Sequence, residues 1–242
     1  MGFSLDVGLF LCTDPDGEEH WPLAAREAYL GAMNEALRGL GLAEHREPRA
    51  LDEIDPPLDP GTDPCLLGES MGPYSSHARR ADRLDWLARH VAVVGSAPAA
   101  EPPYEPGMYQ AYDTLPDRGA AFDHLLAACQ QEVVVLPRRL ERVLCADSPA
   151  GVMCFVSAQR LRTEAAALAF VLRYPDPSEP ASPVVDPVTG DPVEDRSFAG
   201  LDTRVAEDAE SWQRWADESV LCHRLLRCTA DILRTGALGH TS

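Results

Sequence analysis

Apolar residues occupy every second position at the start of the chain. They are Phe3, Leu5, Val7, Leu9 and Leu11. A period of two places such side chains on one face of an extended backbone, so the pattern predicts a half-buried strand. Two later runs, Glu132–Leu136 and Gly151–Val156, are almost entirely apolar and predict two further strands.

Apolar residues recur at intervals of three and four in five other stretches, which is the period of a helix. We expect these helices over about 22–40, 76–94, 122–129, 157–173 and 204–235. Pro22 suits a first helical position, and Ser157 is a candidate N-cap. The last helix has the clearest pattern, an apolar seam formed by Trp212, Trp215, Ser219, Cys222, Leu226, Thr229 and Leu233.

Three ranges rich in Pro and Asp separate these elements. They lie near 43–72, 95–116 and 175–200, and they show neither the period of a strand nor that of a helix. We interpret them as mobile acidic loops, because long loops in a compact domain are usually functional or mobile. The chain has no internal repeat and no clear domain boundary. The sequence therefore predicts one α+β domain over residues 1–242, in which about five helices pack on a small sheet.

The charge balance is strongly negative. The chain has 39 Asp and Glu residues against 21 basic residues, all of them Arg, and its formal charge is −18. Such a charge repels nucleic-acid backbones and anionic lipid, so we expect neither nucleic-acid nor membrane binding. A basic protein partner is the natural alternative, although acidic loops can also serve solubility alone.

The acidic surplus is concentrated in loops. Residues 13–70 include fourteen acidic and four basic residues, and residues 173–210 include ten acidic and three basic residues. Clustered carboxylates speed and direct the encounter with a cationic partner. The candidate partner-binding residues are Asp14, Asp16, Glu18, Glu19, Asp52, Glu53, Asp55, Asp59, Asp63, Asp186, Asp191, Glu194 and Asp195.

Residue usage excludes several classes of enzyme and favours a reducing compartment. Without any Lys, the chain lacks the P-loop lysine, the Schiff-base lysine and the Ser-x-x-Lys pair. Its seven scattered Cys residues, odd in number and without a Cys-x-x-Cys motif, indicate buried free thiols. We find no secretory signal and no run of 18 apolar residues. We therefore expect a cytoplasmic protein that needs no cofactor and no metal.

Three local patterns could carry chemistry. Gly68-Glu-Ser70-Met-Gly72 matches the nucleophile motif of α/β-hydrolases, but the strand before it is short and the helix after it is delayed by Pro73. Cys222 and His223 point about 100° apart on a helix, which disfavours a shared zinc ion. His124 and Cys129 are five residues apart, so we expect a packed thiol and a histidine on the helix surface.

Several segments together resemble an uncharacterised family of acidic actinobacterial cytoplasmic proteins. They are Phe3–Phe10, Pro73–Ser76, His124-Leu-Leu126, Val133–Pro137 and Gly151–Ser157, followed by Leu161 and Glu164. The chain departs from that family at Gln130-Gln131, where the family carries an acidic, glycine-containing turn. The resemblance implies a shared fold and supplies no catalytic residue. The small acidic proteins of that family are loosely similar to immunity proteins.

These observations favour a non-enzymatic acidic binding protein, immunity-like in masking a basic protein partner. One alternative is a serine hydrolase that uses Ser70. Another is a small-molecule-binding accessory protein of a biosynthetic pathway, with a pocket near Trp212 and Trp215 between the sheet and the last helix. The oligomeric state is open.

Overall fold

A five-stranded mixed sheet organises the protein, in a computed structural model that describes residues 5–11, 22–58, 76–99, 121–173 and 214–241. The strand order is β1-β5-β2-β4-β3. Its members are β1 (Leu5–Val7), β2 (Val134–Leu136), β3 (Leu144–Ser148), β4 (Gly151–Ser157) and β5 (Gly239–Thr241). Strands β2 and β4 are parallel, and every other neighbouring pair is antiparallel.

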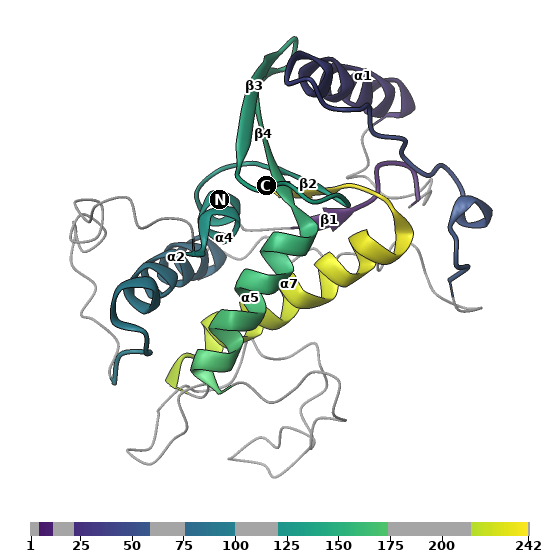
Figure 1. Cartoon of the computed structure of the whole chain (residues 1–242). Coiled ribbons are helices and arrows are strands. Elements are labelled where there is room, and N and C mark those ends of the chain that lie inside the picture. The colour runs from purple at the N-terminus through teal and green to yellow at the C-terminus, as the bar shows by residue number, and fades with distance from the viewer. Residues whose placement is uncertain (1–4, 12–21, 59–75, 100–120, 174–213, 242) are drawn as a thin grey trace.

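Helices cover both faces of the sheet (Figure 1). They are α1 (Leu23–Gly39), α2 (Ser76–Val94), α4 (Asp123–Gln130), α5 (Ala158–Leu172) and α7 (Ala216–Thr235), with a short 3-10 turn η1 at Leu51–Glu53. Helix α1 lies on one face, and α2, α4, α5 and α7 gather on the other. The sheet is therefore the middle of three layers.

The alternation of side chains along β2 and β4 creates two separate cores. Phe155 and Val134 face α1 and join Met33 and Leu37 of that helix. Cys154 and Val156 face the opposite side and belong to the larger core with α5 and α7. Because successive residues of a strand point to opposite faces, these short apolar strands are buried on both sides.

Helix ends agree with local sequence. The Ser157 hydroxyl accepts a hydrogen bond from the Arg160 amide at 3.3 Å, which confirms Ser157 as the N-cap of α5. Helix α7 ends at Gly236, whose φ of 71° is a left-handed conformation that glycine adopts at little cost. All five predicted helices are present, although α7 is described only from Ala216 and its expected start at 204 lies outside the described residues.

The α+β prediction is confirmed, and the strands differ from it in detail. The first strand ends at Val7 instead of continuing to Leu11, because Gly8 turns the chain with φ of 84° and donates its amide to Leu238 O at 2.8 Å. Strands β3 and β5 were not predicted. Where the predicted loops are described, at 43–58 and 95–99, they lack regular structure apart from η1.

The prediction that all cysteines are free thiols is wrong for one pair. Cys145 and Cys154 form a disulfide between β3 and β4, where the two residues are directly paired in the ladder. Strand register brings them together, and β3 itself was not predicted. Cys222 is a buried thiol, as expected. Cys12 and Cys65 lie outside the described residues.

Candidate functional site

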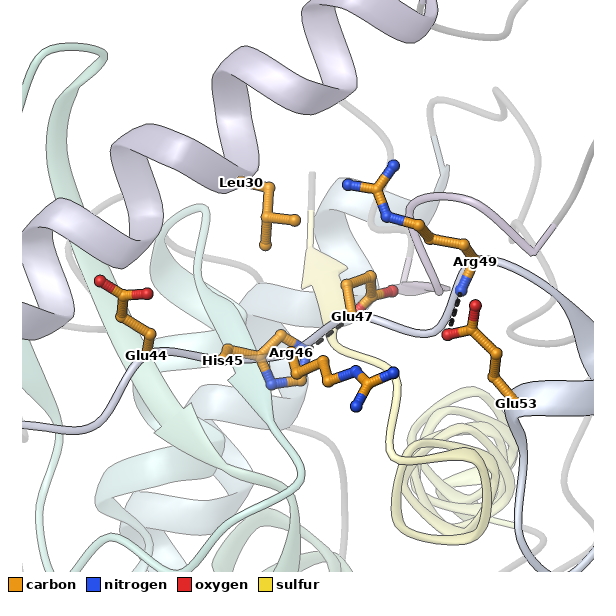
Figure 2. Close-up of a pocket in the computed structure, with 7 residues that line it drawn as sticks. All are labelled: Leu30, Glu44, His45, Arg46, Glu47, Arg49 and Glu53. Atoms are coloured by element: carbon orange, nitrogen blue, oxygen red, sulfur yellow. Dashed lines mark hydrogen bonds and ion pairs between the residues drawn. The ribbon is translucent and has the colours of Figure 1, made fainter.

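A polar cleft lies beside the segment that joins α1 to η1 (Figure 2). Its volume is about 360 Å³, and it is lined by Leu30, Glu44, His45, Arg46, Glu47, Arg49 and Glu53. A second cavity of about 290 Å³ shares Arg46 and Glu53 and reaches Thr235 and Gly236 at the end of α7. The two cavities adjoin at Arg46 and Glu53, on the segment that also carries three of the thirteen predicted acidic residues, Asp52, Glu53 and Asp55.

Glu47 fixes the floor of this cleft. Its carboxylate is buried and accepts the amides of Leu9 at 2.8 Å and Leu238 at 2.9 Å, which flank β1 and β5. His45 Nε2 lies 2.6 Å from the second carboxylate oxygen. Asn34 of α1 then exchanges two hydrogen bonds with the His45 backbone. The loop is thus bonded to both the sheet and α1, which holds the cleft in place.

The cleft walls contain both signs of charge. Arg49 forms a two-pronged pair with Glu27 of α1, with nitrogen–oxygen distances of 2.5 and 2.9 Å, and this hydrogen-bonded arginine lowers the pKa of Glu27. Arg38 pairs with Glu44 at 2.5 Å. Because these pairs are exposed, each contributes little stability, and their main effect is to position side chains.

Three predicted partner-binding residues, Asp52, Glu53 and Asp55, lie on or beside η1, and all three are exposed. Glu53 accepts the Arg49 amide at 3.4 Å. Asp52 and Asp55 form no hydrogen bond or ion pair with the rest of the described structure, so their charges are available to a partner. The other ten predicted residues lie in ranges 12–21, 59–75 and 174–213, outside the described residues.

A second polar cluster lies at the junction of α4, β4 and α5, and it corrects the expectation for His124. His124 is fully buried, not on the helix surface. Its Nδ1 accepts the Ser157 amide at 3.0 Å, so the neutral ring carries its proton on Nε2. Glu164 is 3% exposed and accepts the Leu125 amide at 2.8 Å near the start of α4.

Burial shifts both titrating groups of this cluster away from their charged forms. It raises the pKa of Glu164 to about 7, against the opposing effect of the Leu125 amide. It lowers the pKa of His124 to about 4, with a smaller contribution from the charge of Arg160. His124, Ser157 and Glu164, three of the residues on which the family resemblance rests, are therefore neighbours in the fold.

This trio has the residue types of a hydrolytic triad without its geometry. The imidazole contacts the Ser157 backbone amide, whereas a general base must reach the hydroxyl. The hydroxyl instead contacts Gln159 Oε1 at 3.0 Å and caps α5. Ser157 is also fully buried. The cluster satisfies buried backbone amides and joins α4 to the β4–α5 turn.

Two other chemical hypotheses fall partly beyond the described residues. Ser70 and Trp212 are not among them. Trp215 is 1% exposed, stacks on Trp86 with ring centroids 5.9 Å apart, and donates to Pro98 O at 3.3 Å. It is thus a core residue. Within the described ranges, no group of three His, Cys, Asp or Glu side chains could hold a metal ion.

No helix in the part of the chain that the structure describes is long and apolar enough to cross a membrane.

The net charge divides unevenly between the described ranges and the rest of the chain. The described ranges contain eighteen acidic residues and eighteen arginines, so their formal charge is zero. The remaining ranges contain twenty-one acidic residues and three arginines, and they carry the whole charge of −18. The described part of the chain, called the frame below, is therefore formally neutral, and the acidic surplus lies in the rest of the sequence.

Fold and charge together define an acidic α+β protein without a recognisable catalytic centre among its described residues. A family model described as "Putative DNA-mimic protein" matches residues 1–238, and the chain belongs to that family. No curated protein and no solved structure matches it. Membership agrees with the predicted relationship to acidic proteins. The actinobacterial origin and the immunity-like character stay predictions.

Proposed function

We propose that the protein binds a DNA-binding protein and occupies the surface with which that partner holds DNA. The observation that carries this proposal is the net charge of −18, whose acidic surplus is concentrated in residues 13–70 and 173–210. Membership of a DNA-mimic family supports it. The activity is binding without catalysis, and the partner is a basic protein of the cytoplasm.

The physical basis is the replacement of phosphates by carboxylates. Double-stranded DNA presents one negative charge per roughly 1.7 Å of its axis, and basic residues that neutralise phosphates supply most non-specific affinity. Closely spaced Asp and Glu side chains offer a partner the same sign of charge. Asp52 and Asp55 have this property on the described surface, because both are exposed and lack an ion pair within the described structure.

Buried carboxylates of the frame have local partners that offset the cost of burying their charge. Like charges in a core-forming region would oppose compaction, since net charge far from zero destabilises the compact state. Here Glu47, Glu164 and Glu218, the buried glutamates, each contact a backbone amide, a histidine or an arginine. Among the described residues, each buried glutamate is therefore compensated by a local partner.

The proposal is tested by competition with DNA. The immobilised protein is used to recover partners from a lysate of its own organism, and the purified pair is then studied by fluorescence anisotropy. We expect affinity to fall steeply between 50 and 200 mM salt, as it does for protein–DNA complexes. We also expect duplex DNA to displace the protein from its partner. A partner that binds duplex DNA and this protein at the same time would refute mimicry.

Matched variants locate the binding surface. Asp52→Asn with Asp55→Asn removes two negative charges beside η1, and Glu132→Gln with Asp147→Asn removes two exposed charges elsewhere on the frame. We expect only the first pair to weaken binding and flatten its salt dependence. A third variant, with Asp186, Asp191, Glu194 and Asp195 changed to their amides, tests the predicted range 186–195. Equal effects of the first two pairs would show that net charge alone matters.

A further inference from the structure

The hairpin formed by β3 and β4 differs on its two faces. On one face, Leu144 and Ala146 of β3 pack against the core of α1. On the other face, Cys145 and Val152 are exposed, and Val152 has an exposed fraction of 70%. Strand β3 is also an edge strand, hydrogen-bonded only to β4. The disulfide between Cys145 and Cys154 therefore lies at the edge of the sheet, with Cys145 exposed.

The two cysteine residues of this bond differ in their exposure to solvent. Cys145 is exposed, whereas Cys154 is 6% exposed within the core shared with α5 and α7. Thiol–disulfide exchange requires an attacking thiolate to reach a sulfur atom, so we expect the attack at Cys145, the more exposed of the two residues. Exposed disulfides are typically the labile and regulatory ones, and those of reducing compartments are usually transient or redox-sensing.

We propose that Cys145 and Cys154 form a reversible exchange site for low-molecular-weight thiols, which controls the order of β3 and its packing on α1. A thiolate attacks Cys145 Sγ, a mixed disulfide forms there, and the electron pair leaves on Cys154, which takes a proton from water. A second thiolate attacks the small-molecule sulfur of the mixed disulfide and releases Cys145 as a thiolate. The protein disulfide is reduced to two thiols, and two small thiols are oxidised to their disulfide.

The bond matters to β3 because this edge strand pairs with β4 alone and is otherwise held by the packing of Leu144 and Ala146 on α1. The cross-link spans a sequence separation of nine residues at the edge of the sheet. Closing a loop of that size restricts the open state of the hairpin, and its loss should favour opening on the order of 100-fold. Opening of the hairpin would remove Leu144 and Ala146 from the core that they cover beside α1. The β2–β3 loop would be affected too, because its Arg138 donates to Ala43 O and Glu44 O beside the cleft.

Glutathione buffers of increasing reduced fraction test the site on the whole chain. Samples are quenched in acid, alkylated and analysed by mass spectrometry, and amide hydrogen exchange is measured in parallel. We expect the ratio of disulfide to dithiol protein to fall with the inverse square of reduced glutathione at fixed oxidised glutathione, with the mixed adduct on Cys145 only. Reduction should speed amide exchange in 144–148 on the order of 100-fold and leave 158–172 unchanged.

Two variants separate the redox effect from general destabilisation. Cys145→Ser should show the fast exchange of β3 in every buffer, because it cannot form the bond. Cys222→Ala changes a buried thiol outside the hairpin and should keep the wild-type response to glutathione. The proposal fails if both cysteines are alkylated in fully oxidising buffer, if the adduct forms on Cys154, or if β3 exchange is the same in both redox states. None of these readouts involves a protein partner.

Discussion

His124 and Glu164 should give the stability of the fold two opposing responses to pH. Glu164 has a pKa of about 7 in the folded protein, against an ordinary value of 4.5. Its proton is held more tightly when the chain is folded, so its contribution is complete below pH 4.5 and is lost as pH rises through 7. His124 has a pKa of about 4 against 6.5, so its contribution is present above pH 6.5 and is lost as pH falls through 4.

Each shift corresponds to about 3 kcal/mol of unfolding free energy, from roughly 1.4 kcal/mol for each pH unit between the two pKa values. Between pH 4.5 and 6.5 the stability from Glu164 falls while that from His124 rises, so the pH dependences of the two contributions nearly cancel. A variant that lacks one of the two groups should therefore show the pH dependence of the other. Glu164→Gln keeps an acceptor for the Leu125 amide, and His124→Asn keeps an acceptor for the Ser157 amide.

Urea unfolding followed by circular dichroism, from pH 4 to 8, measures both effects. Relative to wild type, we expect the stability of Glu164→Gln to rise by about 3 kcal/mol between pH 4.5 and 7, and that of His124→Asn to fall by about 3 kcal/mol between pH 4 and 6.5. A constant loss at every pH would reflect only altered packing. Parallel curves for the variants and the wild type would thus refute the assignment of buried, shifted groups.

Three further predictions concern single contacts and use the same unfolding assay at pH 7. Glu47→Ala should cost about 2–5 kcal/mol, because it leaves two backbone amides without an acceptor, and Glu47→Gln should cost less. Gly239→Ala should cost about 1–3 kcal/mol, because the new methyl group would lie 2.5 Å from the Ile232 side chain. Arg83→Met should cost about 3 kcal/mol by removing the arginine that pairs with buried Glu218, and adding Glu218→Met should recover most of that loss.

Periodicity predicted the helices well because each one buries a continuous face. The Trp215–Leu233 seam of α7 and the Ser157 cap of α5 are local patterns, and both are found as predicted. Strands β3 and β5 were missed for the opposite reason. Leu144–Ser148 and Gly239–Thr241 carry few β-branched or aromatic residues, and their neighbours in the sheet make them extended.

The polar clusters could not be predicted, because burial of a charged residue is decided by distant parts of the chain. Glu47 contacts an amide 191 residues away, and Glu164 contacts one 39 residues away. The sequence shows each as one more acidic residue in an acidic protein. The disulfide likewise depends on strand register. By contrast, Asp52 and Asp55 were expected to be exposed, and they are.

The position of β5 sets the order in which this protein can assemble. Residues 239–241 pair with β1 on one side and β2 on the other, so residues 5–7 reach the sheet only through them. During synthesis, the first strand must wait for more than two hundred later residues to leave the ribosome before it finds a partner. Contacts so distant in sequence slow folding, and a chaperone that shields Leu5 and Val7 would act in that interval.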